Sequence, residues 1–210
     1  MGSEFQSLNT MQLDVLKEIG NIGAGNAATA LATMISGKIE MKIPEIGILG
    51  FNEVTELVGG ADAYVTGIYL IAKGPAPVNI LFLISVEKVC NLLDLLMDRP
   101  ANTSKPETLD EIDYSAITEI GNIISSTFLN ALASVTGFEF TPSVPAMAMD
   151  MAGAVMDSVL ALFGEVEDHV LLLKTQFIRD KEDMVCNFFL LPNAGSLKII
   201  LSALGVNNNG

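Results

Sequence analysis

Apolar residues recur at helical spacing in two long stretches of the chain, at about 11–36 and 110–136. A period of three to four residues is typical of a helix that buries one face. Asn9 or Thr10 is a suitable N-cap for the first of these helices, and Gly37 is a suitable C-terminal stop. The pattern therefore predicts two long amphipathic helices.

Shorter elements follow each long helix, in the same order. In the first half we expect a strand at 39–51, a helix at 52–58, strands at 62–73 and 76–86, and a helix at 86–97; in the second half, a strand at 138–149, a helix at 151–163, strands at 167–178 and 183–191, and a helix at 194–204. Gly74 and Pro75 supply the turn of a hairpin. The predicted fold class is α+β: a duplicated α-β-α-β-β-α unit with pseudo-two-fold symmetry, whose mostly antiparallel sheet is flanked by the two long helices.

Two segments of the chain match without a gap, at the offset of 101 residues that separates Glu18 from Glu119. The first reads LKEIGNIGAGNAATALATMIS at 16–36, and the second reads ITEIGNIISSTFLNALASVTG at 117–137. This match indicates an internal duplication. We expect one domain over 6–206, made of repeats at about 7–98 and 108–206 that a polar linker at 99–107 joins. Residues 1–5 resemble a cloning remnant and are left out of that domain.

Half of the 210 residues are hydrophobic, and the mean hydropathy is +0.47. Such a chain can bury a large core, but it also raises the question of a membrane span. The longest apolar run, Val78–Val86, is much shorter than the roughly 18 residues that a span requires, and Asn79 and Ser85 interrupt it. The first residues show no basic and apolar signal sequence. We therefore expect a cytoplasmic protein without membrane insertion.

The net charge of −14 argues against nucleic acid as a partner, because phosphate binding requires clustered Lys and Arg. The charge is compatible with simple solubility or with attraction to a basic partner surface. Cys90 and Cys186 are isolated and are expected to be buried free thiols; with His169 as the single histidine, the sequence predicts no metal site. Residues 23–28 fit G-x-G-x-x-A, but the helical pattern before them argues against a nucleotide site.

Each long helix carries a polar stripe. At 100° per residue, Asp14, Glu18 and Asn21 lie within an arc of about 60°. The second helix repeats the stripe as Ser115, Glu119 and Asn122. An Asn side chain is no general base, but its amide can orient a water molecule, and Glu can pair with a lysine of a partner. Because phosphoryl transfer depends mainly on positioning and charge neutralisation, each stripe is a candidate half-site that a partner protein completes.

Glycine precedes the stripe asparagine in both helices, as Gly20 and Gly121. A glycine inside a helix costs about 1 kcal/mol relative to alanine. Its recurrence indicates a close approach, either of a neighbouring element of the fold or of an inserting partner. The sequence leaves both interpretations open.

The complete pattern resembles the signature of the CheC/CheX/FliY phosphatase family. A proline follows each asparagine at a distance of 23 residues, so the two copies read Asp14, Glu18, Asn21, Pro44 and Ser115, Glu119, Asn122, Pro145. The resemblance covers about 7–206. It is strongest to the CheC type, because the motif occurs twice, whereas CheX has one functional copy and FliY carries a further flagellar-switch domain for which no residues remain.

The resemblance implies a chemotaxis hydrolase that removes the aspartyl-phosphate of the response regulator CheY. Asn21 or Asn122 would orient the hydrolytic water, and Glu18 or Glu119 would contact the active-site lysine of the regulator. Asp14 and Ser115 would support the stripe, while Pro44 and Pro145 would shape the strand that follows. The chain itself would bind no cofactor, because Mg²⁺ would be supplied within CheY.

The family also implies a second partner, the receptor-modifying deamidase CheD. The candidate contact lies on the small, apolar side of the second-half helix, at Asp150, Ala152, Gly153 and Ala154. An ordinary core helix is the other interpretation of that segment. The alternative to catalysis is a non-catalytic adaptor that binds CheY or CheD.

Overall fold

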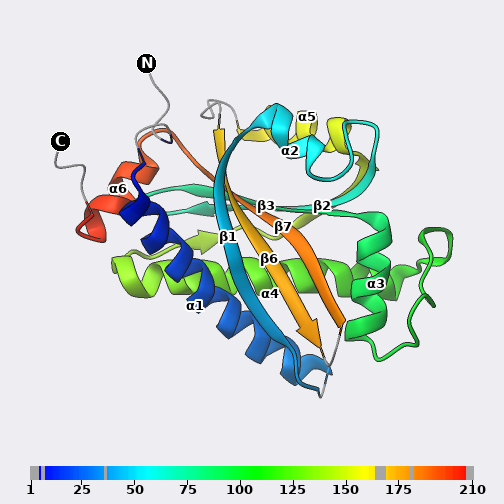
Figure 1. The fold of residues 1–210 in the computed structure, drawn as a ribbon. Coiled ribbons are helices and arrows are strands. Elements are labelled where there is room, and N and C mark those ends of the chain that lie inside the picture. Colours follow the sequence, from blue (N-terminus) through cyan, green and yellow to red (C-terminus); the bar gives the residue numbers. More distant parts are fainter. Residues whose placement is uncertain (1–4, 6–7, 36, 164–168, 180–181, 207–210) are drawn as a thin grey trace.

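The computed structural model describes residues 5, 8–35, 37–163, 169–179 and 182–206. Helices and strands follow each other in the predicted order (Figure 1): α1 (Thr10–Ile35), β1 (Glu40–Gly50), α2 (Phe51–Glu56), β2 (Tyr64–Lys73), β3 (Val78–Ser85), α3 (Val86–Leu96), the 3-10 helix η2 (Pro106–Thr108), α4 (Glu111–Thr136), β4 (Thr141–Pro142), β5 (Ala146–Met151), α5 (Ala152–Phe163), β6 (His169–Arg179), β7 (Glu182–Pro192) and α6 (Ser196–Ala203).

One antiparallel sheet contains all seven strands, in the order β1-β6-β7-β3-β2-β4, with β5 also paired to β2. The pair β3–β7 forms the centre of the sheet. Next to β3 lies its hairpin partner β2, followed by β4 and β5 of the second half. Next to β7 lies its hairpin partner β6, followed by β1 of the first half. The order thus reads the same from both edges, which confirms the predicted pseudo-two-fold α+β fold.

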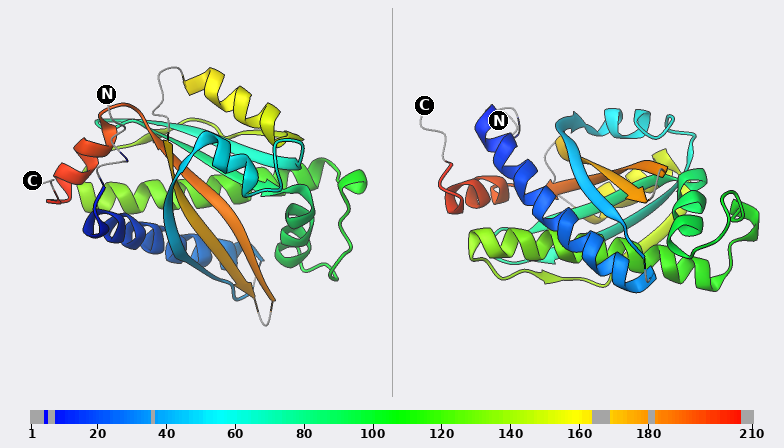
Figure 2. Two further views of the ribbon diagram at one scale, coloured as in Figure 1. Left: turned by 45° about the horizontal axis from the view of Figure 1, so that its top comes forward. Right: turned by 60° about the horizontal axis from the view of Figure 1, so that its bottom comes forward.

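The helices enclose the sheet in layers. The long helices α1 and α4 cover one face, and α2 and α5 cover the other (Figures 1 and 2). The larger apolar core lies under the long helices, with Leu16 and Ile19 of α1 and Ile117 and Ile120 of α4 among its members. The smaller core lies on the other face, where Val155 of α5 belongs to it.

The apolar run at Val78–Val86 is explained by the central strand β3, whose residues are buried up to Ser85. A strand covered on both faces has no polar side and reads as a continuous apolar segment. No helix within the described part of the chain combines the length and the hydropathy that a membrane crossing requires.

Matching capping boxes begin the two long helices. At α1, the backbone N–H of Gln12 donates to Oδ1 of Asn9, and the N–H of Asn9 donates to Oε1 of Gln12, both at 3.0 Å. At α4, Asp110 and Asp113 form the same reciprocal pair. Each box satisfies N–H groups that a helix otherwise leaves without a partner. The sequence identified Asn9 as a possible cap but missed the box.

The buried member of each box also binds the opposite half of the molecule. Nε2 of Gln12 donates to the carbonyl oxygen of Val206 at 2.9 Å, just beyond α6. Asp113 forms a salt bridge of 2.7 Å with Arg99, just beyond α3. The start of each long helix is therefore tied to a segment that follows a short helix of the other repeat.

The predicted linker at 99–107 is organised by one buried carboxylate. Asp94 of α3 accepts hydrogen bonds from the backbone N–H groups of Thr103 and Ser104, at 2.8 and 2.9 Å, and from the Ser104 hydroxyl at 2.6 Å. The connection between the repeats thus has defined internal contacts, which its polar composition alone did not predict.

The single strand predicted at 138–149 is wrong: the segment contains the short strands β4 and β5 with a break between them. Pro142 and Pro145 cannot donate to a strand ladder. Between them, the Ser143 hydroxyl accepts from the N–H of Ile71 at 3.1 Å, and Val144 is 88% exposed. The N–H of Ser143 still donates to the carbonyl oxygen of Ile71 at 2.8 Å, so the segment stays beside β2 while its register shifts by one residue between Pro142 and Ala146.

Phe5 corrects a second expectation, because residues 1–5 were left out of the predicted domain. Its side chain is 1% exposed and belongs to the larger core. An aromatic side chain that reaches apolar surface gains free energy by burial, whatever the origin of the segment. The remainder of the suspected cloning remnant, 1–4, lies outside the described residues.

Candidate functional site

The two polar stripes lie on the outer faces of α1 and α4. Asp14 and Glu18 are exposed, and Asn21 is half-buried because it lies where the helix meets the sheet. The second stripe shows the same gradient, from exposed to half-buried, along Ser115, Glu119 and Asn122. Each carboxylate is thus open to a partner, while each amide is placed closer to the body of the protein.

Asn21 is fixed by the backbone of β1. Its Oδ1 accepts a hydrogen bond of 2.8 Å from the N–H of Ile43. Within the described part of the chain, its Nδ2 has no hydrogen-bond partner. The side-chain amide is therefore held by its oxygen, and its N–H groups make no hydrogen bond to the described residues.

A β-bulge makes this anchor possible. Lys42 pairs with Gln176 and Glu45 pairs with Lys174, so that Ile43 and Pro44 together face a single residue of β6. Proline cannot donate to a ladder and is found at edges and bulges, and β1 is an edge strand. The bulge accommodates Pro44, and Ile43 directs its N–H to Asn21 instead of to the sheet.

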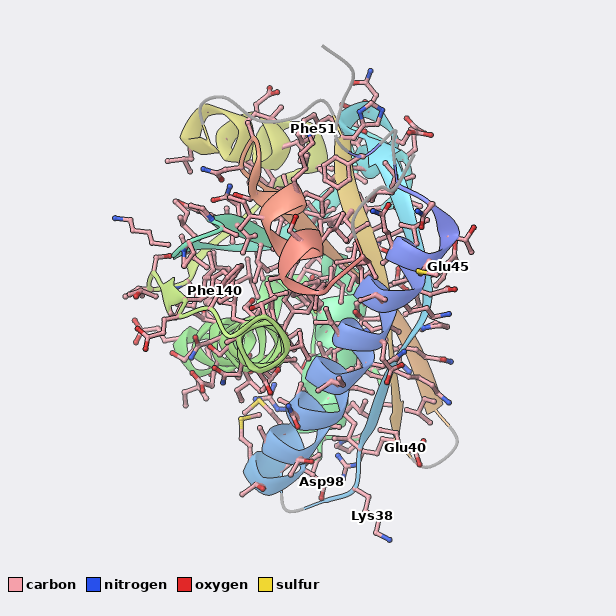
Figure 3. All side chains as sticks on the ribbon, turned by 90° about the vertical axis from the view of Figure 1, so that its left-hand side faces the viewer. Lys38, Glu40, Glu45, Phe51, Asp98 and Phe140 are labelled. Carbon is pink, nitrogen blue, oxygen red and sulfur yellow. The ribbon has the colours of Figure 1, made fainter. Side chains whose placement is uncertain are left out.

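A second contact joins α1 to the bulge. Nζ of Lys17 donates to the carbonyl oxygen of Pro44 at 2.6 Å. Charged residues line the rest of this outer edge, where Glu40 and Glu45 project from β1 (Figure 3). Such charges discourage another strand from adding to the sheet.

In the second copy, no backbone group of the described residues anchors the asparagine. Nδ2 of Asn122 lies 3.4 Å from Oε2 of Glu119, and the Ser126 hydroxyl lies 3.4 Å from Oδ1 of Asn122. Both distances are long for hydrogen bonds. Val144 takes the place of Ile43 in the repeat, but it lies in the break between β4 and β5. Two stripes that share Glu and Asn therefore hold their asparagines differently.

Asp14 and Ser115, which were expected to support the stripes, make no hydrogen bond to the stripe Glu or Asn among the described residues. The Ser115 hydroxyl instead donates to the carbonyl oxygen of Glu111 at 2.8 Å, on its own helix. A supporting role for these two positions stays a prediction for the complex with a partner.

The paired glycines pack against the sheet, so the interpretation as a point of partner insertion is wrong. A Cβ atom on Gly20 would lie 2.7 Å from Cδ2 of Leu173, and one on Gly121 would lie 2.6 Å from Cδ1 of Ile68. Both glycines are buried. They let the helices approach the strands closely, which brings the adjacent asparagines to the sheet.

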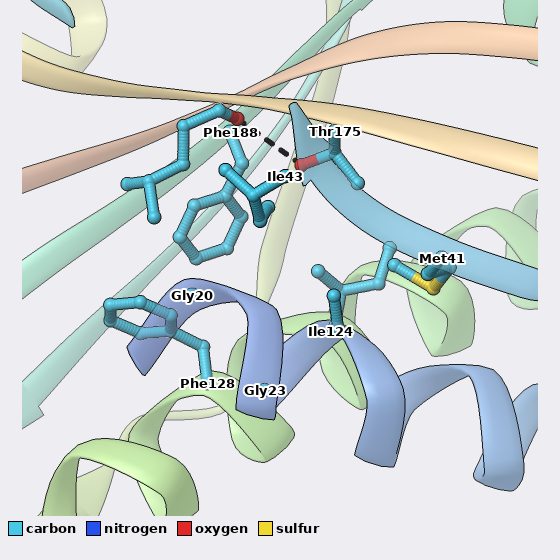
Figure 4. Close-up of a pocket in the computed structure, with 10 residues that line it drawn as sticks. Gly20, Gly23, Met41, Ile43, Ile124, Phe128, Thr175 and Phe188 are labelled. Carbon is cyan, nitrogen blue, oxygen red and sulfur yellow. Dashed lines mark hydrogen bonds between the residues drawn. The ribbon is translucent and has the colours of Figure 1, made fainter. Parts of the chain in front are cut away.

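A small apolar cavity lies beside this contact, between α1, α4 and the sheet (Figure 4). Gly20 and Gly23 line it from α1, and Phe128 lines it from α4. A Cβ atom on Gly23 would lie 2.9 Å from Cα of Phe128, so Gly23 marks the point where the two long helices cross. The segment 23–28 lies inside α1 and does not follow a strand, as a dinucleotide-binding turn would require.

The residues proposed for CheD contact differ in their exposure to solvent. Ala152 is 0% exposed, and its N–H donates to the carbonyl oxygen of Ala63 at 2.8 Å. Asp150 and Ala154 are exposed, and Gly153 is half-buried. The core-helix interpretation is therefore correct for the inner side of α5, and only its outer side is available to a partner.

Both cysteines are free and buried, as expected. Burial raises the pKa of Cys186 to about 12, and burial together with nearby Asp94 raises the pKa of Cys90. Neither thiol is a nucleophile at neutral pH. Among the residues that the structure describes, no three His, Cys, Asp or Glu side chains gather as a metal ion would require.

Known proteins share this architecture. The structure of FliY from Thermotoga maritima matches with a TM-score of 0.75 at 19% identity, covering 95% of this chain and 98% of that one. The middle domain of FliM from H. pylori matches with a TM-score of 0.66 at 11% identity, covering 93% and 99%. The chain is thus one of the duplicated α+β proteins that have the fold of FliY and of the FliM middle domain.

Sequence comparison identifies the family within this fold class. The model of the CheC-like family matches residues 11–48 and 113–148, the two segments that carry the stripes. The CheY-P phosphatase CheC of Bacillus subtilis is 31% identical over 207 residues, 98% of this chain and 99% of that protein. The flagellar motor switch phosphatase FliY of B. subtilis is 25% identical over 142 residues, 68% of this chain and 36% of that protein. The chain belongs to the CheC-like family.

Proposed function

We propose that this protein is a phosphatase that hydrolyses the aspartyl-phosphate of phosphorylated CheY. The observation that carries the proposal is the pair of exposed Glu-Asn stripes on equivalent helices, in a chain that is 31% identical along its length to a CheY-P phosphatase.

In the proposed reaction the regulator brings the phosphoryl group and Mg²⁺, and this chain brings the amide. Asn21 or Asn122 orients a water molecule in line with the bond between phosphorus and the aspartyl oxygen. The water oxygen bonds to phosphorus, the bond to the aspartyl oxygen breaks, and a water proton passes to a phosphate oxygen. The products are inorganic phosphate and the free Asp carboxylate. Glu18 or Glu119 pairs with the lysine of the regulator and fixes the docking register.

Phosphate release from purified phosphorylated CheY tests this proposal. Asn21→Ala or Asn122→Ala should each remove one site, and the double variant should fall to the spontaneous rate. Asn26→Ala on α1 and Asn130→Ala on α4 are matched controls, because both asparagines are exposed and lie outside the stripes. A double variant with full activity would refute the site assignment. A wild-type chain that binds CheY but never accelerates dephosphorylation would be an adaptor.

We propose CheD as a second partner, bound by the outer side of α5. The support is the pair of small residues on that side, the half-buried Gly153 and the exposed Ala154, close in sequence to the exposed Asp150 near the end of β5. Ala154→Arg should abolish binding of CheD in a titration and leave the CheD-free phosphatase rate unchanged. Ser202→Arg, at an exposed position of α6, is the control for added charge. CheD binding that persists in the Ala154→Arg variant would exclude this surface.

A further inference from the structure

Each long helix presents one large apolar side chain to solvent in its first turn. Met11 and Ile112 occupy equivalent positions of the two repeats, and each is 65% exposed. A single exposed apolar side chain needs no explanation, because much of any protein surface is apolar. A pair at the same position of a duplicated helix, with the same exposure, indicates a shared role.

Among the described residues, neither side chain belongs to an apolar core. Each is the second residue of its helix, directly before Gln12 or Asp113, which the capping boxes hold in buried positions. In α1, Leu8 and Leu13, not Met11, pack against the larger core around the helix start. The capping boxes therefore fix the first turn, and with it the direction in which Met11 and Ile112 point outward.

Both residues are continuous with the stripes. Glu18 follows Met11 by seven positions, which is two helical turns, about 20° of rotation and about 10.5 Å along the axis. Asp14 lies between the two, within the same arc. Ile112 stands in the same relation to Glu119. Each stripe thus begins with an apolar residue, continues with carboxylate or hydroxyl, and ends at the half-buried asparagine.

We propose that Met11 and Ile112 are apolar docking contacts for the phosphorylated response regulator, one for each stripe. This inference rests on the proposed function and specifies how the regulator is held. The occupant is an apolar patch of the regulator, about two helical turns from the lysine that meets Glu18 or Glu119. Exposed charge pairs contribute little affinity and act mainly on orientation and association rate. A buried apolar contact beside them supplies residence time.

The duplication provides an internal control for the experiment. In a chain with Asn122→Ala only the first stripe is competent, and in a chain with Asn21→Ala only the second. Met11→Ser should raise KM for phosphorylated CheY about tenfold in the first chain, with kcat within about twofold, and should not change KM in the second. Ile112→Ser should give the opposite pattern. Met11→Leu keeps the apolar surface and should keep KM, and Ile199→Ser on α6 controls for loss of an exposed apolar residue elsewhere.

A binding measurement separates this inference from the phosphatase proposal. CheY bearing beryllium fluoride, which imitates the phosphoryl group, is titrated into the wild type and into the double variant Met11→Ser, Ile112→Ser. We expect a Kd at least tenfold weaker for the double variant. An unchanged Kd and KM would overturn the inference while the phosphatase proposal stands. A weaker Kd in a protein that releases no phosphate would support the docking contacts and refute the phosphatase.

Discussion

The two stripe asparagines should differ sharply in their effect on stability. Asn21→Ala removes the acceptor for the N–H of Ile43, a residue that is buried at the bulge of β1. A buried donor left without a partner costs about 1–3 kcal/mol. Asn122→Ala breaks only two long contacts of 3.4 Å near the surface. We therefore expect it to be close to neutral.

The comparison isolates the anchor because both substitutions replace Asn by Ala inside a helix. The gain in helix propensity, up to about 0.7 kcal/mol, is common to the two variants and cancels in their difference. Because Asn21 is only half-buried, water can replace part of the lost bond, so the expected difference is about 1–2 kcal/mol. With a urea m-value of about 2–3 kcal/mol/M, the unfolding midpoint of Asn21→Ala should lie about 0.5 M below that of Asn122→Ala.

Asn21→Asp distinguishes the anchor from the chemistry. The carboxylate keeps an oxygen that can accept from Ile43, so the unfolding midpoint should stay near that of the wild type. The N–H groups are lost, so the first site should still lose activity. Equal midpoints for Asn21→Ala and Asn122→Ala would show that the bond between Asn21 and Ile43 does not hold the bulge, and would refute the reasoning.

Three further predictions concern the core and the linker. Gly23→Ala should destabilise the protein by about 1–3 kcal/mol in urea unfolding, because its Cβ would meet the backbone of Phe128 at 2.9 Å. Gly25→Ala has open space around its Cβ and should stabilise α1 by up to about 1 kcal/mol. A loss of stability in both variants would contradict the packing. Asp94→Ala should cost more than about 2 kcal/mol in the same assay, since it leaves the N–H groups of Thr103 and Ser104 unpaired; a neutral result would show that Asp94 does not organise the linker. Cys186 should resist a thiol reagent until the protein unfolds. Because its pKa rises from 9.0 to about 12 on folding, its contribution to stability should be complete below pH 9 and disappear as pH rises toward 12. Cys186→Ala should remove this part of the loss of stability at alkaline pH.

Much of the fold follows from the sequence because the signals agree with one another. The 3.6-residue period identifies α1 and α4, the Gly74–Pro75 turn identifies the hairpin of β2 and β3, and the repeat transfers each assignment to the other half. The break between β4 and β5 was missed because alternating apolar residues lie on both sides of it, Phe138 and Phe140 before and Met147 and Met149 after. The two prolines were visible, but their effect depends on which backbone groups the neighbouring strand requires.

The stripes were predictable, whereas the difference between them was not. The helical arc places Glu18 with Asn21 from sequence alone. The anchor of Asn21 is a backbone N–H, which every residue but proline possesses, so no residue type identifies it. Its sequence signal is Pro44 on an edge strand, which favours a bulge. Pro145 gives the same signal in the other repeat, where the register also shifts by one residue, but Val144 is exposed and has no hydrogen bond to Asn122 among the described residues.

Each half of the sheet ends in a strand of the other half, and each long helix is tied at its start to the other half as well. A chain that contained one repeat alone would therefore have an outer strand with no hairpin to pair with. Two such chains could pair as a symmetric dimer, each adding its outer strand to the hairpin of the other. The present molecule has the form of such a pair with its subunits fused through 99–107. Fusion frees the halves from the need to be identical, so that one site can fix its asparagine on a bulge N–H while the asparagine of the other makes only long side-chain contacts.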